Sequence, residues 1–283
     1  MYKQFLSKEL DLRDVYKLMV SGIAPRPIAF VTSQDTDGNY NLAPFSYFNG
    51  FGSNPPVIGF SPANSGRTGQ EKDTLKNIRE TKFFTISLVS YSMIDQMNLS
   101  SCEYARNIDE YVKSGLEKEF FNNKIPFVKE TPFAMNCKLI DIIELGGNPG
   151  SGNLILGEVI SFYIRDDILN GDGTIDPYQM DLISRMGDAF YSRANKGIFE
   201  YKKPRCNGIG FDNIPKVAFE NNILLAQDIA RLAGVDKIPE CQKDFPLKSG
   251  LSKDELLLHC QSLIKSDKIN DAWQVIHILS EHG

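Results

Sequence analysis

The residues with the clearest chemical pattern lie in the segment SPANSGRTGQEKDT, at positions 61–74. Hydroxyl groups, two glycines and the cations Arg67 and Lys72 precede a short helix that we predict at 74–79, with Asp73 as its N-cap. Exposed N–H groups and the positive end of a helix dipole favour an anion, and each cation adds a full charge. The segment therefore predicts a phosphate site, with a solvated polar loop as the alternative.

The preceding segment, NLAPFSYF at 41–48, places hydroxyl groups and prolines among aromatic residues. If 40–48 forms one strand, alternation puts Pro44, Ser46 and Phe48 on the same face, which then combines a flat apolar surface with a hydroxyl group. A planar heterocycle with an amide-like edge, such as an isoalloxazine ring, needs that combination. An edge strand that tolerates a proline is the alternative interpretation.

Histidine and cysteine exclude several kinds of chemistry. All three histidines follow residue 258, so the preceding part of the chain lacks a Ser-His-Asp or Cys-His nucleophile and any metal site built from histidine. The five cysteines are scattered without a C-x-x-C pair, and we expect reduced thiols that are buried or idle: Cys102, Cys137, Cys206, Cys241 and Cys260. We therefore assign no catalytic side chain and expect a bound cofactor to carry the chemistry of any enzyme here.

Composition narrows the class of protein. The 283 residues are 42% hydrophobic and 24% charged, which is typical of a globular chain. The net charge of −5 provides no broad basic field, so we expect neither nucleic acid nor anionic lipid as a partner. No apolar run approaches the roughly 20 residues of a membrane span, and the start lacks the pattern of a secretory signal. We expect a cytoplasmic protein without a membrane partner.

The elements that position these residues are predicted to be mostly strands, at 28–33, 40–48, 57–61, 82–90, 134–145 and 154–165. Asp37-Gly38 predicts a tight hairpin turn, and Ser92 with Asp95 predicts the capping box of a short helix. The glycine-rich segment 146–153 allows backbone to approach a ligand closely. Short strands at near-regular spacing, without βαβ alternation, favour a closed or nearly closed antiparallel barrel.

The pattern changes to helix from about Pro204 onward. Apolar residues recur at helical spacing in 218–234 and in the two following segments, the first of which begins with a capping box of Ser252 and Glu255. We interpret these apolar stripes as packing faces. The chain is therefore divided into a β-rich domain, 1–203, and a helical C-terminal extension, 204–283.

Several segments, in this order, resemble the flavin reductase-like, FMN-binding split-barrel family, in its branch with RPIA and NLAPFSYF signatures. The similar pieces are APRPIAFVTS, DGNYNLAPFSYFN, NPPVIGFS, KDTLKNIRET, NLILGEV and RMGDAFYSR, and the similarity covers about residues 15 to 215. The resemblance implies a mainly β fold: an antiparallel, Greek-key-like split β-barrel with peripheral helices, here followed by the helical extension.

The resemblance also implies noncovalent FMN binding by residues at matching positions. Contacts to the flavin ring and ribityl chain fall to Pro44, Ser46, Tyr47 and Phe48, and contacts to the phosphate fall to Ser61, Asn64, Arg67, Thr68, Lys72 and Thr74. Arg26 is expected to face the cofactor. Family members are typically homodimers with flavin near the interface, so Arg185 or the segment 146–153 is expected to close the site from either subunit.

The activity that the resemblance implies is that of a flavin-dependent oxidoreductase, which moves hydride or electrons from NAD(P)H or a reduced protein through flavin N5 to an acceptor that the sequence does not reveal. Many NADH-dependent members carry a histidine just before the motif similar to LILGEV, where this chain has Gly152. A flavin-binding or sensing module without turnover is therefore an alternative. An interaction subunit that uses the helical extension is another.

Overall fold

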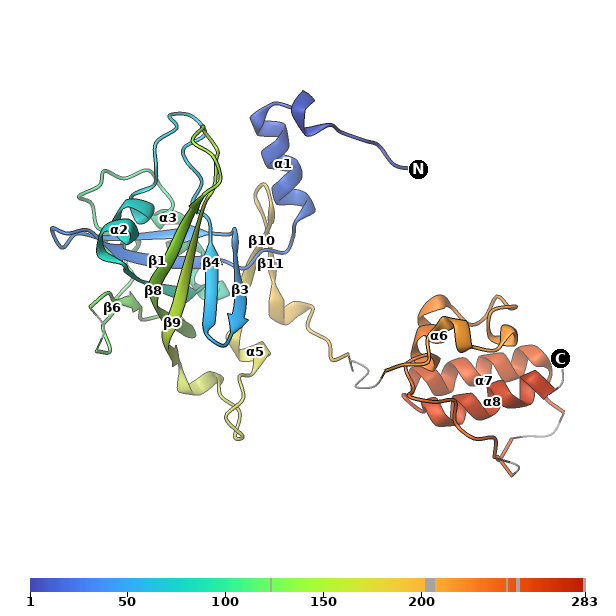
Figure 1. Cartoon of the computed structure of the whole chain (residues 1–283). Coiled ribbons are helices and arrows are strands. Elements are labelled where there is room, and N and C mark those ends of the chain that lie inside the picture. Colours follow the sequence, from blue (N-terminus) through green and yellow to red (C-terminus); the bar gives the residue numbers. More distant parts are fainter. Residues whose placement is uncertain (123, 202–206, 243, 248–249, 282–283) are drawn as a thin grey trace. The chain divides into compact units, whose positions relative to one another are not determined.

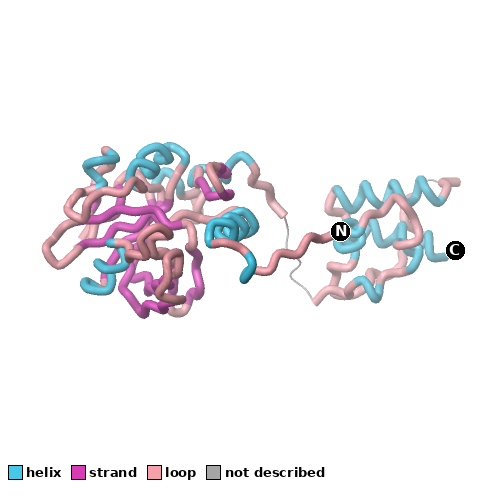
Figure 2. Tube along the Cα trace, turned by 90° about the horizontal axis from the view of Figure 1, so that it is seen from above, coloured by secondary structure: helices cyan, strands magenta, loops and turns pink. Residues whose placement is uncertain are grey.

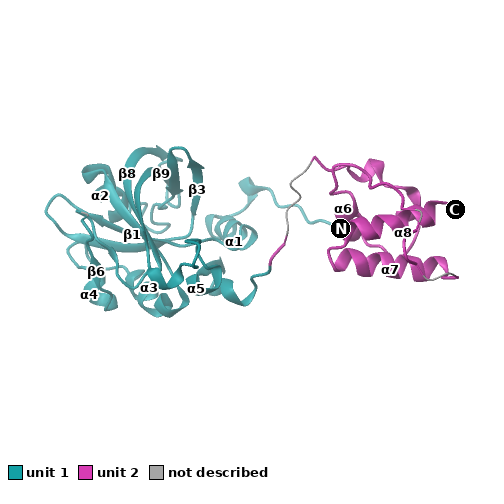
Figure 3. Ribbon diagram, turned by 90° about the horizontal axis from the view of Figure 1, so that it is seen from below, with its two compact units in different colours: residues 1–199 teal, residues 200–283 magenta. Residues whose placement is uncertain are grey.

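The computed structural model describes residues 1–122, 124–201, 207–242, 244–247 and 250–281. The chain forms two compact units, Met1–Phe199 and Glu200–Gly283 (Figure 3). The predicted boundary at 203/204, together with Cys206 and His282, lies outside the described residues. No helix among the described residues combines the length and apolar character needed to cross a bilayer.

The first unit is built on an antiparallel sheet of seven strands in the order β2-β1-β5-β8-β9-β4-β3. Figure 1 labels β1, β3, β4, β8 and β9 of this sheet, and Figure 2 shows the strands of the unit in magenta. Their bounds are Ala29–Gln34 (β1), Tyr40–Phe45 (β2), Phe48–Ser53 (β3), Pro56–Phe60 (β4), Phe83–Leu88 (β5), Phe133–Glu144 (β8) and Asn153–Ile164 (β9). Two short pairs complete the strands: Lys118–Glu119 (β6) with Phe127–Val128 (β7), and Ile183–Gly187 (β10) with Phe190–Arg193 (β11).

The expected strand 40–48 is wrong, because the chain leaves β2 after Phe45 and starts β3 at Phe48. β2 pairs with β1 and β3 pairs with β4, so these consecutive strands form the two edges of the described sheet. Only Ser46 and Tyr47 connect these edges, which brings one end of β2 next to one end of β3. The sheet therefore curls without closing, which confirms the split barrel. Strand alternation cannot place Ser46 and Phe48 on a common face with Pro44 across such a break.

Strand β1 is buried on both faces and separates two hydrophobic clusters. Ala29 and Val31 face the barrel interior with Phe60, Phe84, Ile86 and Ile155, while Phe30 lies on the other side with Leu42, Met93 and Met97. On that second side the hydroxyl groups of Thr32 and Tyr111 are 2.7 Å apart. A Gly38 φ of +91° completes the turn from β1 to β2, as the Asp37-Gly38 step predicts.

The helices of this unit are Leu12–Gly22 (α1), Asp73–Thr81 (α2), Ile94–Ser100 (α3), Glu110–Ser114 (α4) and Pro177–Met180 (α5). α1, which the sequence did not reveal, has Asp11 as its N-cap, and the Asp11 carboxylate accepts the Asp14 N–H at 2.8 Å. α2 covers the barrel with Leu75 and Ile78.

Two predicted helix caps are corrected. The N-cap of α2 is Lys72, and Asp73 is the first helical residue, with its carboxylate 3.2 Å from the Lys76 ammonium. Near α3, the Ser92 hydroxyl lies 3.0 Å from that of Ser90 and makes no cap, because a 3₁₀ turn, Tyr91–Met93, precedes the helix.

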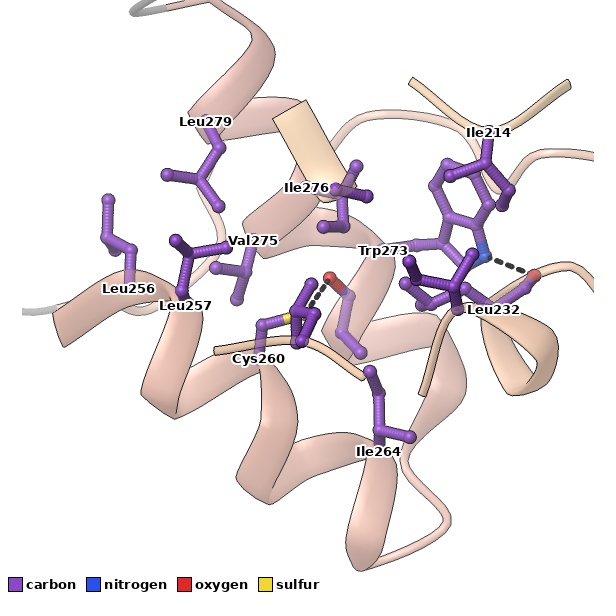
Figure 4. Packing of buried hydrophobic residues seen from close by; sticks show 14 of the residues in the cluster. Ile214, Leu232, Leu256, Leu257, Cys260, Ile264, Trp273, Val275, Ile276 and Leu279 are labelled. Carbon is purple, nitrogen blue, oxygen red and sulfur yellow. Dashed lines mark hydrogen bonds between the residues drawn. The ribbon is translucent and has the colours of Figure 1, made fainter. Parts of the chain in front are cut away.

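The second unit packs Ala226–Leu232 (α6), Lys253–Lys265 (α7) and Ile269–Glu281 (α8) around Trp273 (Figure 4). The indole N–H donates to the Leu232 carbonyl at 3.1 Å, and the predicted capping box at Ser252 is present. The expected helix 218–234 is too long. Its first part is irregular because the Asn221 side-chain oxygen accepts the N–H groups of Ile223 and Leu224, which holds the chain in a turn.

Candidate functional site

Two adjoining hollows lie at the end of β2 in the first unit and share Pro44, Phe45 and Ser101. The narrow hollow has a volume of about 220 Å³ and is also lined by Ile28, Ser46, Met97, Asn98, Arg185 and Tyr191. The wide hollow has a volume of about 610 Å³. Its further lining comes from β2, from the range 65–74 and from residues 100–104 at the end of α3 and after it, together with Glu110.

The narrow hollow has one polar wall held by contacts among its own residues. The Arg185 guanidinium lies 4.6 Å from the centre of the Tyr191 ring and donates to the Asp188 carbonyl at 2.6 Å. The Tyr191 hydroxyl donates to the Asn98 side-chain oxygen at 2.9 Å, which joins the β10–β11 hairpin to α3. Ile28, Phe45 and Met97 supply apolar surface to the same hollow. The hollow thus combines aromatic and aliphatic surface with a few fixed polar groups.

The wide hollow is lined by polar groups from segments far apart in the sequence. The Asn41 amide on β2 donates to the Thr74 hydroxyl on α2 at 2.8 Å, across 33 positions of sequence. In the loop before α2, the Ser65 hydroxyl accepts the Thr68 N–H at 3.2 Å, which shapes a turn around Arg67. Lys72 is exposed at the helix start. Hydroxyl-bearing residues and two cations, next to the start of a helix, therefore line one hollow, which suits an anion.

Acidic residues temper the charge of the wide hollow. Glu71 bonds to Arg79 at 2.8 and 2.9 Å, and this pairing lowers the pKa of the Glu71 carboxyl. Arg67 bonds to Glu103 at 2.5 Å, with both side chains exposed. The positive charge available to a ligand is therefore smaller than the number of cations implies.

Glu110, the first residue of α4, is a buried carboxyl group that sequence reasoning missed. It accepts the Leu42 N–H at 3.0 Å, which satisfies a donor on the edge strand β2. Burial raises the pKa of this carboxyl, and the hydrogen bond from Leu42 lowers it only in part. Glu110 therefore anchors the strand that forms one wall of the wide hollow.

The structure brings together seven of the residues that the resemblance assigned to the cofactor. Pro44 borders both hollows, Ser46 and Arg185 line the narrow one, and Arg67, Thr68, Lys72 and Thr74 line the wide one. The other five, which lie outside the lining of these hollows in the described residues, are Arg26, Tyr47, Phe48, Ser61 and Asn64.

Arg26 is buried behind the narrow hollow. Its guanidinium donates to the carbonyls of Val20 and Ile23 at the end of α1, and its Nε atom lies 3.4 Å from the Ser46 hydroxyl. Its backbone forms a two-way bridge with Arg185, with both N–O distances 2.9 Å. Arg26 thus positions two lining residues, Ser46 and Arg185, instead of lining the hollow itself.

Ser61 and Asn64 contact the glycine-rich segment 146–153. The Asn153 amide donates to the Asn64 side-chain oxygen at 2.9 Å, and the Asn64 N–H donates to the Ser151 carbonyl at 2.9 Å. A Cβ atom at Gly152 would lie 2.7 Å from the Ser61 hydroxyl. The segment therefore packs behind the loop that carries Arg67, and it lies outside the lining of the two hollows in the described chain.

Tyr47 and Phe48 turn to other surroundings. Phe48 packs against the barrel core, and Tyr47 is a half-buried neighbour of Tyr16 on α1. Burial raises the pKa of the Tyr47 hydroxyl. The residues that sequence reasoning missed in the lining belong mainly to 98–104, which match no motif and reach the hollows only through tertiary packing. Tyr191 on β11 was not singled out either, although it lies in the family-like segment RMGDAFYSR.

Comparison with known proteins places this geometry in a family. A model of the flavin reductase like domain matches residues 21–178. An uncharacterized protein of Aquifex aeolicus is 32% identical over 192 residues, which cover 68% of this chain and 95% of the relative. Nitrilotriacetate monooxygenase component B from Bacillus cereus matches with a TM-score of 0.65 at 30% identity, over 72% of this chain and 98% of that chain. The 2-nitrobenzoate 2-nitroreductase NbaA of Pseudomonas fluorescens matches with a TM-score of 0.64 at 25% identity, over 74% and 100%. The β-rich unit thus makes this chain a member of the flavin reductase-like domain family.

Proposed function

We propose that the chain binds FMN across the two hollows and acts as a flavin-dependent oxidoreductase. The observation that carries this proposal is the juxtaposition of two hollows within a flavin reductase-like domain. The narrow one combines apolar surface with fixed polar groups, and the wide one has Lys72 at a helix start and Arg67 in the loop before it. FMN is divided in the same way, because it has a largely apolar aromatic ring at one end and an anionic phosphate at the other.

The residues present fit this ligand in size and in chemistry. The two volumes, about 220 and 610 Å³, together fall within the range of roughly 300–1,000 Å³ that is usual for ligand pockets. Ile28, Phe45 and Met97 provide surface for a ring, and Ser46 provides a hydroxyl group at its edge. Arg67 and Lys72 provide charge for a phosphate.

Bound FMN would supply hydride and single-electron transfer at N5 of its ring. This chain's own residues would bind and orient it. The Ser46 hydroxyl would donate at the ring edge, Tyr191 and Arg185 would hold one wall of the ring hollow, and Thr74 with Lys72 would hold the phosphate end. Electrostatic support of an electron-rich ring by such donors is the protein's contribution to the reaction.

The donor that we propose is NAD(P)H or a reduced protein. The names of two structural relatives, a monooxygenase component and a nitroreductase, support redox chemistry as the class of reaction. Anaerobic mixing of the FMN-loaded protein with NADH or NADPH tests this directly. Loss of the flavin's visible absorbance within seconds to minutes is the expected result.

One observation favours the alternative, a flavin-binding module that does not use a nicotinamide. A side chain at Gly152, the position where many NADH-dependent members carry histidine, would begin 2.7 Å from the Ser61 hydroxyl, and Gly152 lies outside the lining of the two hollows in the described chain. FMN that binds but is bleached by neither NADH nor NADPH, while dithionite reduces it, would support this alternative.

We also propose a homodimer of the β-rich unit. Helix α1 carries an apolar stripe of Leu12, Tyr16 and Met19 at spacings of one face of a helix, and Ile23 follows at its C-cap. Each of the four is between 44% and 55% exposed. The outward side of β9 adds Ile160 and Phe162, which are 52% and 51% exposed. Exposed apolar surface of this extent supports a protein interface. Light scattering on a size-exclusion column should give twice the chain mass, and Phe162→Glu should lower it.

A further inference from the structure

One ion pair joins two segments that line the wide hollow. The Nη2 atom of Arg67, in the loop before α2, lies 2.5 Å from Oε2 of Glu103, in the segment that follows α3. The two residues are 36 positions apart in sequence, and both belong to the lining. The Glu103 carboxylate therefore already occupies a place beside a cation that the proposed phosphate site requires.

The second cation of the hollow acts on the same carboxylate. The hydrogen bond and the charge of Arg67, with a smaller contribution from Lys72, hold the pKa of the Glu103 carboxyl below its usual range. Glu103 is thus paired with Arg67, and the charge of Lys72 has a smaller effect on the same carboxylate. An incoming phosphate would need the same two partners.

The other acidic residues of the lining do not compete in this way. Glu71 bonds to Arg79, and Asp73 lies 3.2 Å from the Lys76 ammonium, and neither of these cations lines the hollow in the described chain. Glu110 bonds to a backbone N–H. Among the described lining residues, Glu103 is therefore the acidic residue whose ion-pair partner, Arg67, also lines the hollow.

We propose that Glu103 is an internal competitor for the ligand's phosphate and a specificity-determining residue of this site. The inference rests on the proposed binding of FMN and adds that the phosphate must displace the Glu103 carboxylate from Arg67. Affinity for FMN is then lower than the two cations alone would give. Affinity for riboflavin, which has the same ring without a phosphate, does not depend on Glu103.

The exchange is physically accessible because the ion pair is exposed. The side chains of Arg67 and Glu103 are 78% and 69% exposed, and ion pairs of this kind contribute little to stability. Phosphate offers more acceptor oxygens and more charge than a carboxylate, and a guanidinium group binds it with two parallel hydrogen bonds. A phosphate can therefore replace Glu103 at Arg67 without unfolding any element.

The test compares Glu103→Gln with the wild-type chain by titrating each with FMN and with riboflavin, using quenching of flavin fluorescence. The variant keeps the shape of the side chain and removes its charge. We expect FMN to bind about 3- to 10-fold more tightly at low salt, with a smaller gain at high salt, because exposed charges are screened. Riboflavin affinity should stay within about twofold. Thermal unfolding of both chains checks that the fold is unchanged.

Two further variants isolate the competition from a general change of charge. Glu71→Gln also removes one negative charge from the lining, but Glu71 is paired with Arg79, which lies outside the lining of the described hollow. We therefore expect this variant to gain less affinity for FMN than Glu103→Gln. In a chain that already carries Arg67→Gln, adding Glu103→Gln should raise the affinity for FMN by less than about twofold, because Arg67, for which carboxylate and phosphate compete, is no longer present.

Three results would overturn the inference while leaving FMN binding in place: weaker FMN binding by Glu103→Gln, an equal gain for riboflavin, or an equal gain in Glu71→Gln. The first would mean that Glu103 holds Arg67 in position for the phosphate. A wild-type chain that binds neither flavin would refute the proposed function itself, and this inference with it.

Discussion

Removal of both cations from the wide hollow should weaken FMN binding without affecting riboflavin. In Arg67→Ala/Lys72→Ala, two charge-assisted contacts to the phosphate are lost. Hydrogen bonds to charged groups contribute about 1.5–3 kcal/mol each when they are shielded from water. Arg67 is 78% exposed and already bonded to Glu103, so we reduce this to about 0.5–1 kcal/mol for each cation. The sum, about 1–2 kcal/mol, predicts FMN affinity lower by a factor of about 5 to 30.

Fluorescence titration of both flavins at low and high salt measures this effect. The matched control is Lys129→Ala/Arg165→Ala, which removes two cations from exposed ion pairs outside the lining of the described hollows. Its FMN affinity should equal that of the wild-type chain. Unchanged FMN affinity in Arg67→Ala/Lys72→Ala, or an equal loss for riboflavin, would refute the placement of a phosphate in the wide hollow.

Three other changes test the remaining parts of the account. Ser46→Ala should lower the affinities for FMN and for riboflavin by the same factor, about 3- to 10-fold, because the lost hydroxyl group contacts the ring that both flavins share. A titration in which only the affinity for FMN falls would contradict this. Glu110→Gln should raise the melting temperature at about pH 8 and lose that advantage near pH 4. Burial raises the pKa of the Glu110 carboxyl, so this residue destabilises the folded chain as pH rises and the carboxyl loses its proton. Glutamine stays neutral and can still accept the Leu42 N–H. A lower melting temperature of the variant at both pH values would refute this reasoning. Leu257→Ala should destabilise the helical unit by about 2–5 kcal/mol, because this side chain is buried in its core. Fluorescence of the sole tryptophan, Trp273, reports the unfolding of this unit, and we expect bound flavin to stay in place during that transition. Release of flavin in the same transition would show that the two units unfold together.

The parts of the fold that sequence predicted well depend on local chemistry. The Asp37-Gly38 turn and the capping box of Ser252 and Glu255 each need only a few neighbouring residues, and both are present. Strands β8 and β9 follow from long apolar and β-branched runs, and each starts within one residue of its expected position. The resemblance to the family supplied the topology, which no local pattern contains.

The errors arise where tertiary structure or a local side-chain hydrogen bond overrides a repeating pattern. NLAPFSYF is β-rich throughout, but the chain must cross from one edge of the sheet to the other at Ser46 and Tyr47, and no propensity marks that crossing. Helix 218–234 has the right periodicity, yet the Asn221 side chain captures two backbone donors and keeps the first part irregular.

The candidate site was predictable where loop chemistry is local and hidden where it depends on packing. Arg67, Thr68, Lys72 and Thr74 stand together in sequence and also line one hollow. Glu103 reaches the same hollow from a segment without any motif, and only the fold brings it to Arg67.

The most direct test of the central claim is a titration of the purified full-length chain with FMN, followed by flavin fluorescence and the visible spectrum. We expect saturable binding of one FMN per chain and a yellow protein after removal of free ligand. A preparation that stays colourless and leaves FMN fluorescence unchanged would contradict it.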